Sequence, residues 1–288
     1  MTNNCDVSVI FVNYKTKDLT ISAINSVIEK TQNINFEIFV VDNNSQDGSI
    51  EEIEKQFPDI NVIKNKSNIG FGAANNLAIK QAKGKYILCL NTDTVLMNNA
   101  LRIMFDYMEE NPNTGVCGGN LYNENLKPSM SYANFPNFWN CLAFSWLIKR
   151  IFPILRNHTE TKKIKEVDFI TGADIFLRKS VLDAIGYFDE NFFMFAEEAD
   201  LCKRIKNTGY KRVIVPEAKI IHLEGKSSAN FWGNIKLRVK SRYLYAQKHQ
   251  TIIDILGMKL SYILLHSLAL IFTFNKENIE LIKLHFKG

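Results

Sequence analysis

The chain has 288 residues, of which 46% are hydrophobic and 23% charged, a composition typical of a globular protein with enough apolar residues for a sizeable core. Its formal net charge of only +5 argues against a nucleic-acid partner, because nucleic-acid-binding proteins usually carry denser basic clusters. Five cysteines without a CxxC pair argue against a disulfide framework, and no secretory signal is visible at the N-terminus, so we expect a cytoplasmic location.

The first half of the chain alternates strand-like and helix-like segments. Short apolar runs rich in β-branched residues predict strands at 7–12, 36–41, 60–63 and 85–90. Apolar residues at helical spacing predict helices at 18–30, 47–57, 71–82 and 98–110. This alternation predicts an α/β fold with right-handed βαβ units and a mostly parallel sheet flanked by helices.

The second half of the chain is less regular. Its pattern predicts an extended loop region at 120–166, a strand at 167–177, a helix at 196–208, one or two strands at 212–223, a basic helix at 230–249 and an apolar helical stretch at 252–274. We expect one α/β domain over residues 1–228 and a C-terminal helical extension over residues 229–288, toward which the excess positive charge concentrates.

Polar residues follow three of the predicted strands. Asn13 and Tyr14 follow the first strand, Asp42 the second and Asp93 the fourth. Helix capping or a turn would explain any one of them alone. Because ligands of parallel sheets bind at the carboxyl ends of the strands, the set together predicts a ligand site. Asn and Asp there could read a nucleobase edge, Tyr14 could stack on the ring, and the Asp93 carboxylate suits a hard divalent cation that bridges phosphates.

A segment with two glycines, Asn68–Asn76, precedes the predicted helix at 71–82. A tight loop with unusual φ angles is one explanation, and close approach of the backbone to a diphosphate at a helix N-terminus is the other. A dinucleotide fingerprint is disfavoured because GxGxxG would stand directly after the first strand, where Asn13-Tyr14-Lys15 lies instead. A P-loop is excluded because no GxxxxGK[ST] motif occurs.

Three acids within four residues open the helix at 196–208, directly after an aromatic run. Acids at a helix start are explained by the helix dipole, and Asp200 with Arg204 at i,i+4 indicates a structural pair. Glu197 or Glu198 could alternatively act as a general base. His222 ends an apolar strand beside a Gly-Lys-Ser loop, so both a structural and a functional interpretation stay open for it.

Taken in order, these motifs resemble those of family 2 glycosyltransferases with the GT-A fold, especially the bacterial rhamnosyltransferase-like branch. The resemblance runs from about residue 7 to about residue 249, and each motif alone is modest. The motifs are VSVIFVNY, VVDNNSQDGS, NIGFGAANN, LNTDT, TGA, GYFDE, EEADL and HLEGKS. The family implies a GT-A type, Rossmann-like sheet, to which this chain adds its C-terminal helical extension.

The resemblance also implies an activity. The expected reaction is metal-dependent, inverting transfer of a sugar from a nucleotide diphosphate donor, dTDP or UDP, to a hydroxyl of a saccharide or lipid-linked acceptor in cell-surface polysaccharide synthesis. Rhamnose is the favoured sugar. The implied donor-site residues are Asn13, Tyr14, Asp42, Asn44, Gly70, Asn75, Asn91 and Thr92. The implied acceptor and sugar pocket is Gly172, Ala173, Asp174 and Phe195, and the implied ligands of Mn²⁺ or Mg²⁺ are Asp93 and His222.

The sequence departs from the family pattern at two places. The DxD metal motif is reduced to Asn91-Thr92-Asp93, which removes one negative charge. The usual base is Asp, whereas Glu198 stands here, and its extra methylene moves the carboxylate by about 1.5 Å. Glu197 is therefore the alternative base. The alternative function is a non-catalytic GT-A domain that binds a nucleotide sugar or a partner. A nucleotidyltransferase is less favoured, because the glycine-rich Lys/Arg loop expected after the first strand is missing.

The apolar run Leu260–Phe274 is shorter than the about 20 residues that a membrane-spanning helix needs. Basic residues precede it at Lys236, Arg238, Lys240, Arg242 and Lys248. Two interpretations stay open. The helix lies in the interface at the inner face of the cell membrane, or it forms a helix pair that packs on the domain or on a second subunit in a homodimer.

Overall fold

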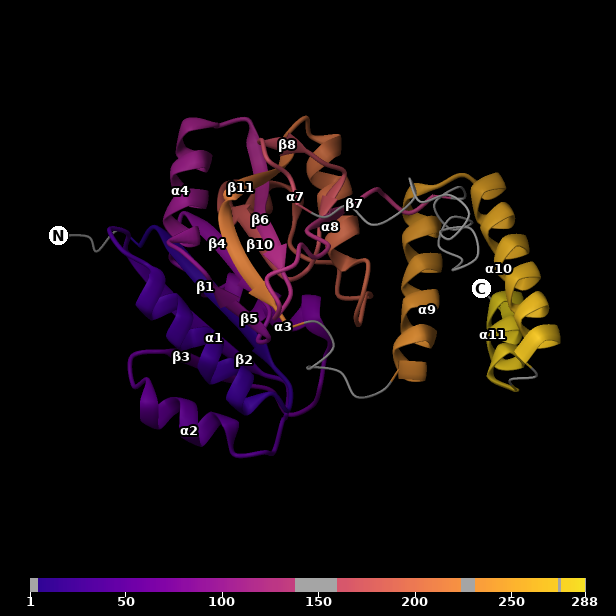
Figure 1. The fold of residues 1–288 in the computed structure, drawn as a ribbon, viewed down its shortest axis with the longest axis horizontal. Helices are drawn as coiled ribbons and strands as arrows, with labels where there is room; N and C mark the ends of the chain where they lie inside the picture. The colour runs from indigo at the N-terminus through magenta and orange to yellow at the C-terminus, as the bar shows by residue number, and fades with distance from the viewer. Residues whose placement is uncertain (1–4, 138–159, 224–230, 274–275, 288) are drawn as a thin grey trace. The chain divides into compact units, whose positions relative to one another are not determined.

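The computed structural model describes residues 5–137, 160–223, 231–273 and 276–287 (Figure 1). The chain divides into two units. The first, here called the sheet unit, comprises Met1–Ala133, His158–Phe193 and Glu197–Ala229. The second, here called the helical unit, comprises Asn134–Asn157, Met194–Ala196 and Asn230–Gly288.

The sheet unit is built on a nine-stranded sheet among the described residues. Its strands are β1 (Val7–Asn13), β2 (Phe36–Asp42), β3 (Asn61–Lys64), β4 (Tyr86–Leu90), β5 (Thr94–Leu96), β6 (Thr114–Tyr122), β8 (Lys165–Glu166), β10 (Asp174–Arg178) and β11 (Lys211–His222). They lie in the order β3-β2-β1-β4-β10-β6-β11-β5, with β8 paired to β11. The β3-β2-β1-β4 half is parallel, whereas β10 runs antiparallel to both β4 and β6.

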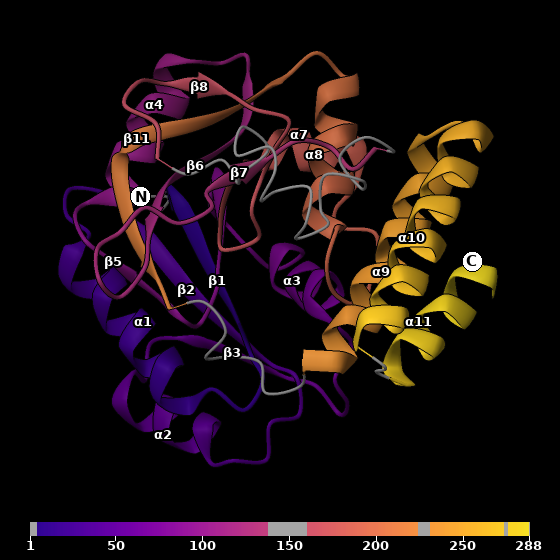
Figure 2. The ribbon, with the colours of Figure 1, turned by 45° about the vertical axis from the view of Figure 1, so that its right-hand side comes forward.

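Helices cover both faces of this sheet (Figure 2). One face is covered by α1 (Lys17–Lys30), α2 (Ser49–Gln56) and α4 (Ala100–Glu110), and the other by α3 (Phe71–Ile79), α7 (Lys179–Ile185) and α8 (Glu197–Asn207). The alternation of side chains along a strand decides which residues meet which helices. In β1, Val7, Val9 and Phe11 share a fully buried cluster with Ile24 and Val27 of α1. The predicted α/β fold with a helix-flanked sheet is therefore confirmed.

Two predictions for the second half are wrong in part. The single strand expected at 167–177 is two strands, because Thr171 turns away and donates its backbone N–H to Ser131 O at 3.1 Å. β9 (Phe169–Ile170) therefore pairs with β7 (Tyr132–Ala133) in a separate small sheet, and only β10 enters the main sheet. The loop expected at 120–166 holds the end of β6, β7 and β8, while 138–159 lie outside the described residues.

The helical unit contains α9 (Phe231–His249), α10 (Ile252–Thr273) and α11 (Lys276–Lys287). The helices predicted at 230–249 and 252–274 are confirmed, whereas α11 was not predicted. A buried cluster of Val239, Tyr243, Ala246, Met258, Tyr262 and Leu281 joins the three helices. In the described part of the chain, no helix is both long enough and apolar enough to cross a membrane. The predicted domain boundary at 228/229 stays a prediction.

Candidate active site

Two residues predicted as metal ligands meet at the edge of the sheet unit. Asp93 lies in the turn between β4 and β5, and His222 is the last residue of β11. β5 and β11 run antiparallel with His222 opposite Thr94, and Leu223 N donates to Asp93 O at 2.9 Å. This ladder places His222 Nε2 3.3 Å from Asp93 Oδ1. The sheet therefore joins two side chains that stand 129 positions apart in the sequence.

The chemistry of this pair fits a divalent cation. A carboxylate oxygen and an imidazole nitrogen are both ligands of Mn²⁺, and the carboxylate alone also suits Mg²⁺. Asp93 is 2% exposed, and His222 Nδ1 has no hydrogen-bond partner among the described residues. No group of three or more His, Cys, Asp or Glu that could hold a metal occurs in the part of the chain that is described. Among the described residues, Asp93 and His222 are therefore the two side chains that would hold the cation.

Asn13 lies at the end of β1, directly opposite Asp42 at the end of β2. Its side chain is fully buried, and its Nδ2 has three acceptors within hydrogen-bond distance for its two hydrogens: Asp42 Oδ1 at 2.8 Å, Ser45 Oγ at 2.9 Å and Ser49 Oγ at 2.8 Å. The other side of the amide, Oδ1, accepts hydrogen bonds from two threonine hydroxyls of the α1 start. This geometry favours a role in which Asn13 holds Asp42 in place, because its own polar atoms are all engaged.

Tyr14 and Asn44 present more accessible side chains at the same edge of the sheet. Tyr14 is 42% exposed, and Asn44 is half-buried. Both loops turn through left-handed residues, with φ of 57° at Lys15 and 65° at Asn44. Lys15 Nζ lies 5.5 Å from the centroid of the Tyr14 ring. A ring and an amide at the carboxyl ends of β1 and β2 suit a flat, hydrogen-bonding ligand such as a nucleobase.

The segment around Gly70 packs against the loop that precedes α8 and is hydrogen-bonded to it. Gly70 has φ of 90°, and a Cβ at this position would lie 2.3 Å from Phe193 O. Phe71 N donates to the same Phe193 O at 3.0 Å. Of the two explanations that the sequence leaves open for this glycine, the φ of 90° agrees with the tight loop, and the close approach in the structure is to protein backbone. Only glycine fits here, because both the φ and the space exclude a side chain.

Neighbouring asparagines extend this contact. Asn75 is fully buried and donates to Phe71 O at 3.0 Å within α3. Asn76 donates to Phe188 O at 2.9 Å and accepts from Phe188 N at 3.0 Å, as a backbone strand partner would. Asn76 belongs to the NIGFGAANN motif, and its contact with Phe188 does not follow from the motif alone. Buried amides in the first turns of a helix were the signal that a docking contact lies there.

Residues at the end of β4 adjoin the start of β10. Asn91 N donates to Ala173 O at 3.0 Å, and Thr92, which is 5% exposed, accepts from Thr16 Oγ1 at 3.1 Å. A Cβ added at Gly172 would meet nothing within 4 Å, so this position borders open space. Asn91, Thr92, Gly172 and Ala173 therefore gather at one edge of the sheet with Asp93.

Asp174 and Phe195 differ from the other members of the predicted acceptor pocket. Asp174 is fully buried and accepts from Gly119 N at 2.6 Å. Burial raises the pKa of its carboxyl well above the usual range, because desolvation disfavours the ionised form. Phe195 falls in the helical unit, where its ring centroid lies 4.2 Å from the Arg238 guanidinium carbon.

The two glutamates that open α8 have different environments. Glu197 is 5% exposed, and its Oε2 has no hydrogen-bond partner among the described residues. Burial, and then the neighbouring Glu198 charge, raise the pKa of Glu197 well above the usual range. Glu198 is only half-buried. Because burial disfavours the ionised form of Glu197, while Glu198 is more accessible, the structure favours Glu198 as the base of this pair.

Two features fix the start of α8. Asp200, which is fully buried, pairs with Arg204 at 2.9 Å between Oδ2 and Nε, which confirms the predicted structural pair. Arg204 also donates to the backbone carbonyls of residues 185–187. Ahead of the helix, Phe195 and Ala196 have φ of 71° and 66°, conformations that cost about 1–2 kcal/mol each for residues with a Cβ. This backbone sets the direction in which α8 begins.

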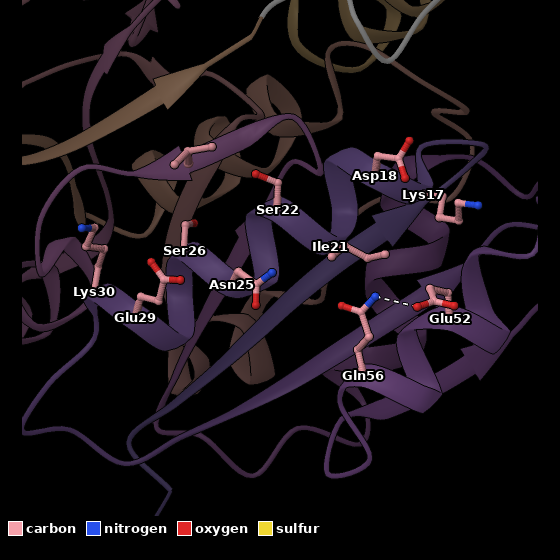
Figure 3. Close-up of a pocket in the computed structure, with 11 residues that line it drawn as sticks. Lys17, Asp18, Ile21, Ser22, Asn25, Ser26, Glu29, Lys30, Glu52 and Gln56 are labelled. Carbon is pink, nitrogen blue, oxygen red and sulfur yellow. Dashed lines mark hydrogen bonds between the residues drawn. The ribbon is translucent and has the colours of Figure 1, made fainter.

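A separate groove lies on the outer surface of α1 (Figure 3). It has a volume of about 630 Å³ and is lined by α1, by Glu52 and Gln56 of α2 and by Val95. None of the predicted site residues lines it, and Gln56 already donates to Glu52 at 2.7 Å. Its wall mixes lysines, acids and amides without a shared charge, so we assign it no role in the site.

Comparison with known sequences agrees with these observations. The family described as Glycosyl transferase family 2 matches residues 8–186. An N-acetylglucosaminyl-diphospho-decaprenol L-rhamnosyltransferase of Mycobacterium tuberculosis is 23% identical over 239 residues, which cover 74% of this chain and 75% of that protein. The rhamnosyltransferase WbbL of Escherichia coli K12 is 26% identical over 193 residues, covering 61% of this chain and 69% of that protein.

Solved structures share the fold. The mannosyltransferase PcManGT of Pyrobaculum calidifontis, in complex with GDP-Man and Mn²⁺, matches with a TM-score of 0.60 at 16% identity, over 99% of this chain and 74% of its own. GalNAc-T7, crystallised with UDP, GalNAc and Mn²⁺, matches with a TM-score of 0.59 at 15% identity over 86% of this chain. The match spans about half, 51%, of the GalNAc-T7 chain. These similarities confirm the predicted GT-A fold.

Proposed function

Because the chain belongs to glycosyl transferase family 2, we propose that it transfers a sugar from a nucleotide diphosphate donor to a hydroxyl acceptor with inversion at the anomeric carbon. The 3.3 Å contact between Asp93 and His222 carries the proposal, because it supplies a carboxylate and an imidazole where the donor's diphosphate would bind. Rhamnose is the proposed sugar and dTDP or UDP the nucleotide, since two relatives are rhamnosyltransferases.

The donor would lie across the carboxyl ends of β1, β2 and β4. Tyr14 would stack on the base, and Asp42, oriented by Asn13, would accept hydrogen bonds from the nucleoside. Asp93 and His222 would hold Mn²⁺ or Mg²⁺. When bound there, the cation neutralises charge on the departing nucleotide diphosphate.

Glu198 would remove the proton of the acceptor hydroxyl. The hydroxyl oxygen then forms a bond to the anomeric carbon from the face opposite the leaving group, while the bond from that carbon to the diphosphate oxygen breaks. The electron pair leaves with the nucleotide diphosphate, and a single displacement inverts the configuration. Support for Glu198 comes from its partial exposure and from the raised pKa of Glu197, since burial disfavours the ionised form of that neighbour.

The proposed acceptor is a saccharide or lipid-linked hydroxyl in cell-surface polysaccharide synthesis, at the cytoplasmic face of the membrane. Support for the lipid-linked acceptor comes from the Mycobacterium tuberculosis relative, whose name contains a diphospho-decaprenol. A homodimer stays a prediction. The non-catalytic alternative rests on one observation, the Glu198 that stands where the family usually has Asp.

A donor-binding assay followed by a transfer assay tests the proposal. The unfolding temperature is measured with a panel of nucleotide sugars, each with Mn²⁺ and with EDTA. We expect one donor, dTDP-rhamnose, to stabilise the protein only with Mn²⁺, by about 2.7 kcal/mol at a concentration of 100 times its Kd. Transfer of sugar to a lipid-linked saccharide then separates the two functions. Binding without any transfer or hydrolysis would indicate the non-catalytic domain, and no stabilisation by any donor would contradict both.

A further inference from the structure

We propose that the helical unit binds an anionic lipid surface through one face of α10. Six large apolar side chains on this helix are exposed, by between 43% and 78% of their surface. They are Ile252, Ile253, Leu256, Leu260, Leu264 and Leu268, here called the α10 apolar face. The spacing of three to four residues places them along one side of the helix for more than four turns. A contiguous apolar patch of this kind on a protein surface marks an interaction site.

The other side of α10 is already packed. Met258, Ser261 and Tyr262 are buried, and two of them share the cluster that joins α10 to α9 and α11. Figure 2 shows α10 running alongside these two helices. Only one face of α10 is therefore available to a partner. A helix packed on one side and apolar on the other is suited to lie in the plane of an interface, with its exposed side chains among the lipid headgroups and acyl chains.

The charge distribution identifies the lipid as anionic. Residues 231–288 contain nine Lys and Arg but three Asp and Glu. Since the whole chain has 35 and 30, residues 1–230 keep 26 and 27, so the positive excess resides entirely in the last 58 residues. Lys236, Arg238, Lys240 and Lys248 of α9 are exposed, as is Lys283 of α11. Each cation near an anionic leaflet adds attraction that salt weakens.

The border of the α10 apolar face has the residue types found at lipid interfaces. Lys259 Nζ donates to Phe286 O at 3.3 Å, which places the end of α11 beside α10. Phe286 is 65% exposed. A lysine stem and an exposed aromatic ring at the edge of an apolar helix can reach the headgroup region together. A second copy of the chain is a less suitable partner, because it would bring two like-charged helical units together.

Co-sedimentation of the full chain with vesicles tests the proposal. We expect binding to vesicles of equal phosphatidylglycerol and phosphatidylcholine at low salt, weaker binding at high salt, and little binding to phosphatidylcholine alone. The double variant Leu260→Ser/Leu264→Ser should bind about tenfold more weakly or less, because it removes two apolar anchors from the α10 apolar face. The matched control is Ile28→Ser/Ile164→Ser, which removes two exposed apolar side chains, of 46% and 47% exposure, from the sheet unit and should bind like the parent.

Two outcomes would overturn the proposal: no binding of the parent chain to the anionic vesicles, or unchanged binding of the double variant. Circular dichroism and the unfolding temperature establish that the double variant is folded. Light scattering after size exclusion is measured in parallel. If the parent is a dimer that the double variant dissociates, and the parent does not bind vesicles, the α10 apolar face joins two copies instead. Vesicle binding needs neither donor nor transfer, so its failure is distinguishable from failure of the proposed activity.

Discussion

The two units of the chain handle polar and apolar groups in opposite ways. The sheet unit buries polar side chains and satisfies many of them internally, as in the Asn13 amide, which has partners on β2, α1 and α2. The helical unit exposes five cations and six large apolar side chains of α10; the cations are Lys236, Arg238, Lys240, Lys248 and Lys283. Preorganised, buried polar groups are what a reaction needs, whereas exposed charge and apolar area favour association. The contrast supports the two proposals made above, sugar transfer by the sheet unit and binding to an anionic lipid surface by the helical unit.

The largest effect should come from the base in the sheet unit. Glu198→Gln removes the proton acceptor but keeps the shape, and general-base catalysis contributes about 10²–10⁴-fold, so we expect kcat to fall about 10³-fold with donor affinity retained. The matched variant Glu197→Gln replaces a buried carboxyl whose ionised form is disfavoured, and it should change kcat less than tenfold. Steady-state transfer kinetics measure both. An inactive Glu197→Gln beside an active Glu198→Gln would reverse the assignment.

Next in size is the loss of the cation site. Asp93→Asn or His222→Ala should weaken Mn²⁺-dependent donor binding about 100-fold, since either change removes one of the two proposed ligands. Isothermal titration with the donor, with Mn²⁺ and with EDTA, measures this effect. The control in the other unit is His249→Ala, whose ring contacts Tyr245 at 4.8 Å and which should leave donor affinity unchanged. Equal affinities of parent and His222→Ala would remove His222 from the site.

A structural variant of the sheet unit comes third. Gly70→Ala combines a left-handed backbone with a clash against Phe193 O, so we expect the free energy of unfolding to fall by about 2–4 kcal/mol. Gly209→Ala is the matched control, because its φ of 87° is nearly the same and nothing lies within 4 Å of its Cβ. The control should lose only the strain, about 1–2 kcal/mol. Denaturant unfolding compares the two, and equal losses would show that the contact with Phe193 is unimportant.

A pH-dependent effect concerns the buried acid of β10. The folded-state pKa of Asp174 is raised above its ordinary value of 3.8, so the stability from the protonated carboxyl is fully present below pH 3.8 and is lost as pH rises through the folded-state pKa. Asp174→Asn mimics the protonated form at every pH. The difference between the free energy of unfolding of the variant and that of the parent should therefore increase as pH rises from 4 to 8, by up to about 1.4 kcal/mol per pH unit. Parallel pH profiles of the two proteins would contradict the raised pKa.

The smallest effect is expected in the helical unit. Leu260→Ser/Leu264→Ser should leave kcat and KM for a water-soluble acceptor within about twofold of the parent, because surface substitutions far from special features seldom change the fold. Transfer to a soluble saccharide acceptor provides the measurement. A large loss of kcat, or a large rise in KM, with this acceptor would show that α10 takes part in the transfer reaction. The proposed roles, transfer in the sheet unit and lipid binding in the helical unit, would then be wrong.

Sequence patterns predicted the regular parts of the fold. The strands β1 to β4 and the helices α1 to α4 have clear periodicity, and the chain from 7 to 110 follows it closely. Three-residue β5 has too few residues for a periodic signal, and α11 is a short helix of 12 residues that begins with the polar residues Lys276, Glu277 and Asn278 after the apolar α10. The split of 167–177 into β9 and β10 depends on a backbone bond to Ser131, a contact that is distant in sequence.

The candidate site was predictable in its residue types but not in its contacts. Polar residues at strand ends indicated Asn13, Asp42 and Asp93, because chain order fixes which strand ends lie at one edge. The Asn13 amide is hydrogen-bonded to Asp42, Ser45 and Ser49. These contacts depend on how α1 and α2 pack, and the periodicity of the sequence does not predict that packing. The difference between Glu197 and Glu198 is a difference in burial between adjacent residues, and neither composition nor spacing reveals it.

The pairing of β5 with β11 has a consequence for how the chain folds during its synthesis. It joins residues 94–96 to residues 220–222, so a long stretch of chain must be ordered before these strands meet. Contacts so distant in sequence carry a large loop-closure entropy and form slowly. A chain still on the ribosome that has not yet exposed β11 cannot have joined Asp93 to His222. We therefore expect nascent chains, and chains shortened at the C-terminus so that they lack β11, to show no transfer from nucleotide sugars. Activity should begin only once β11 has been synthesised and has joined the sheet.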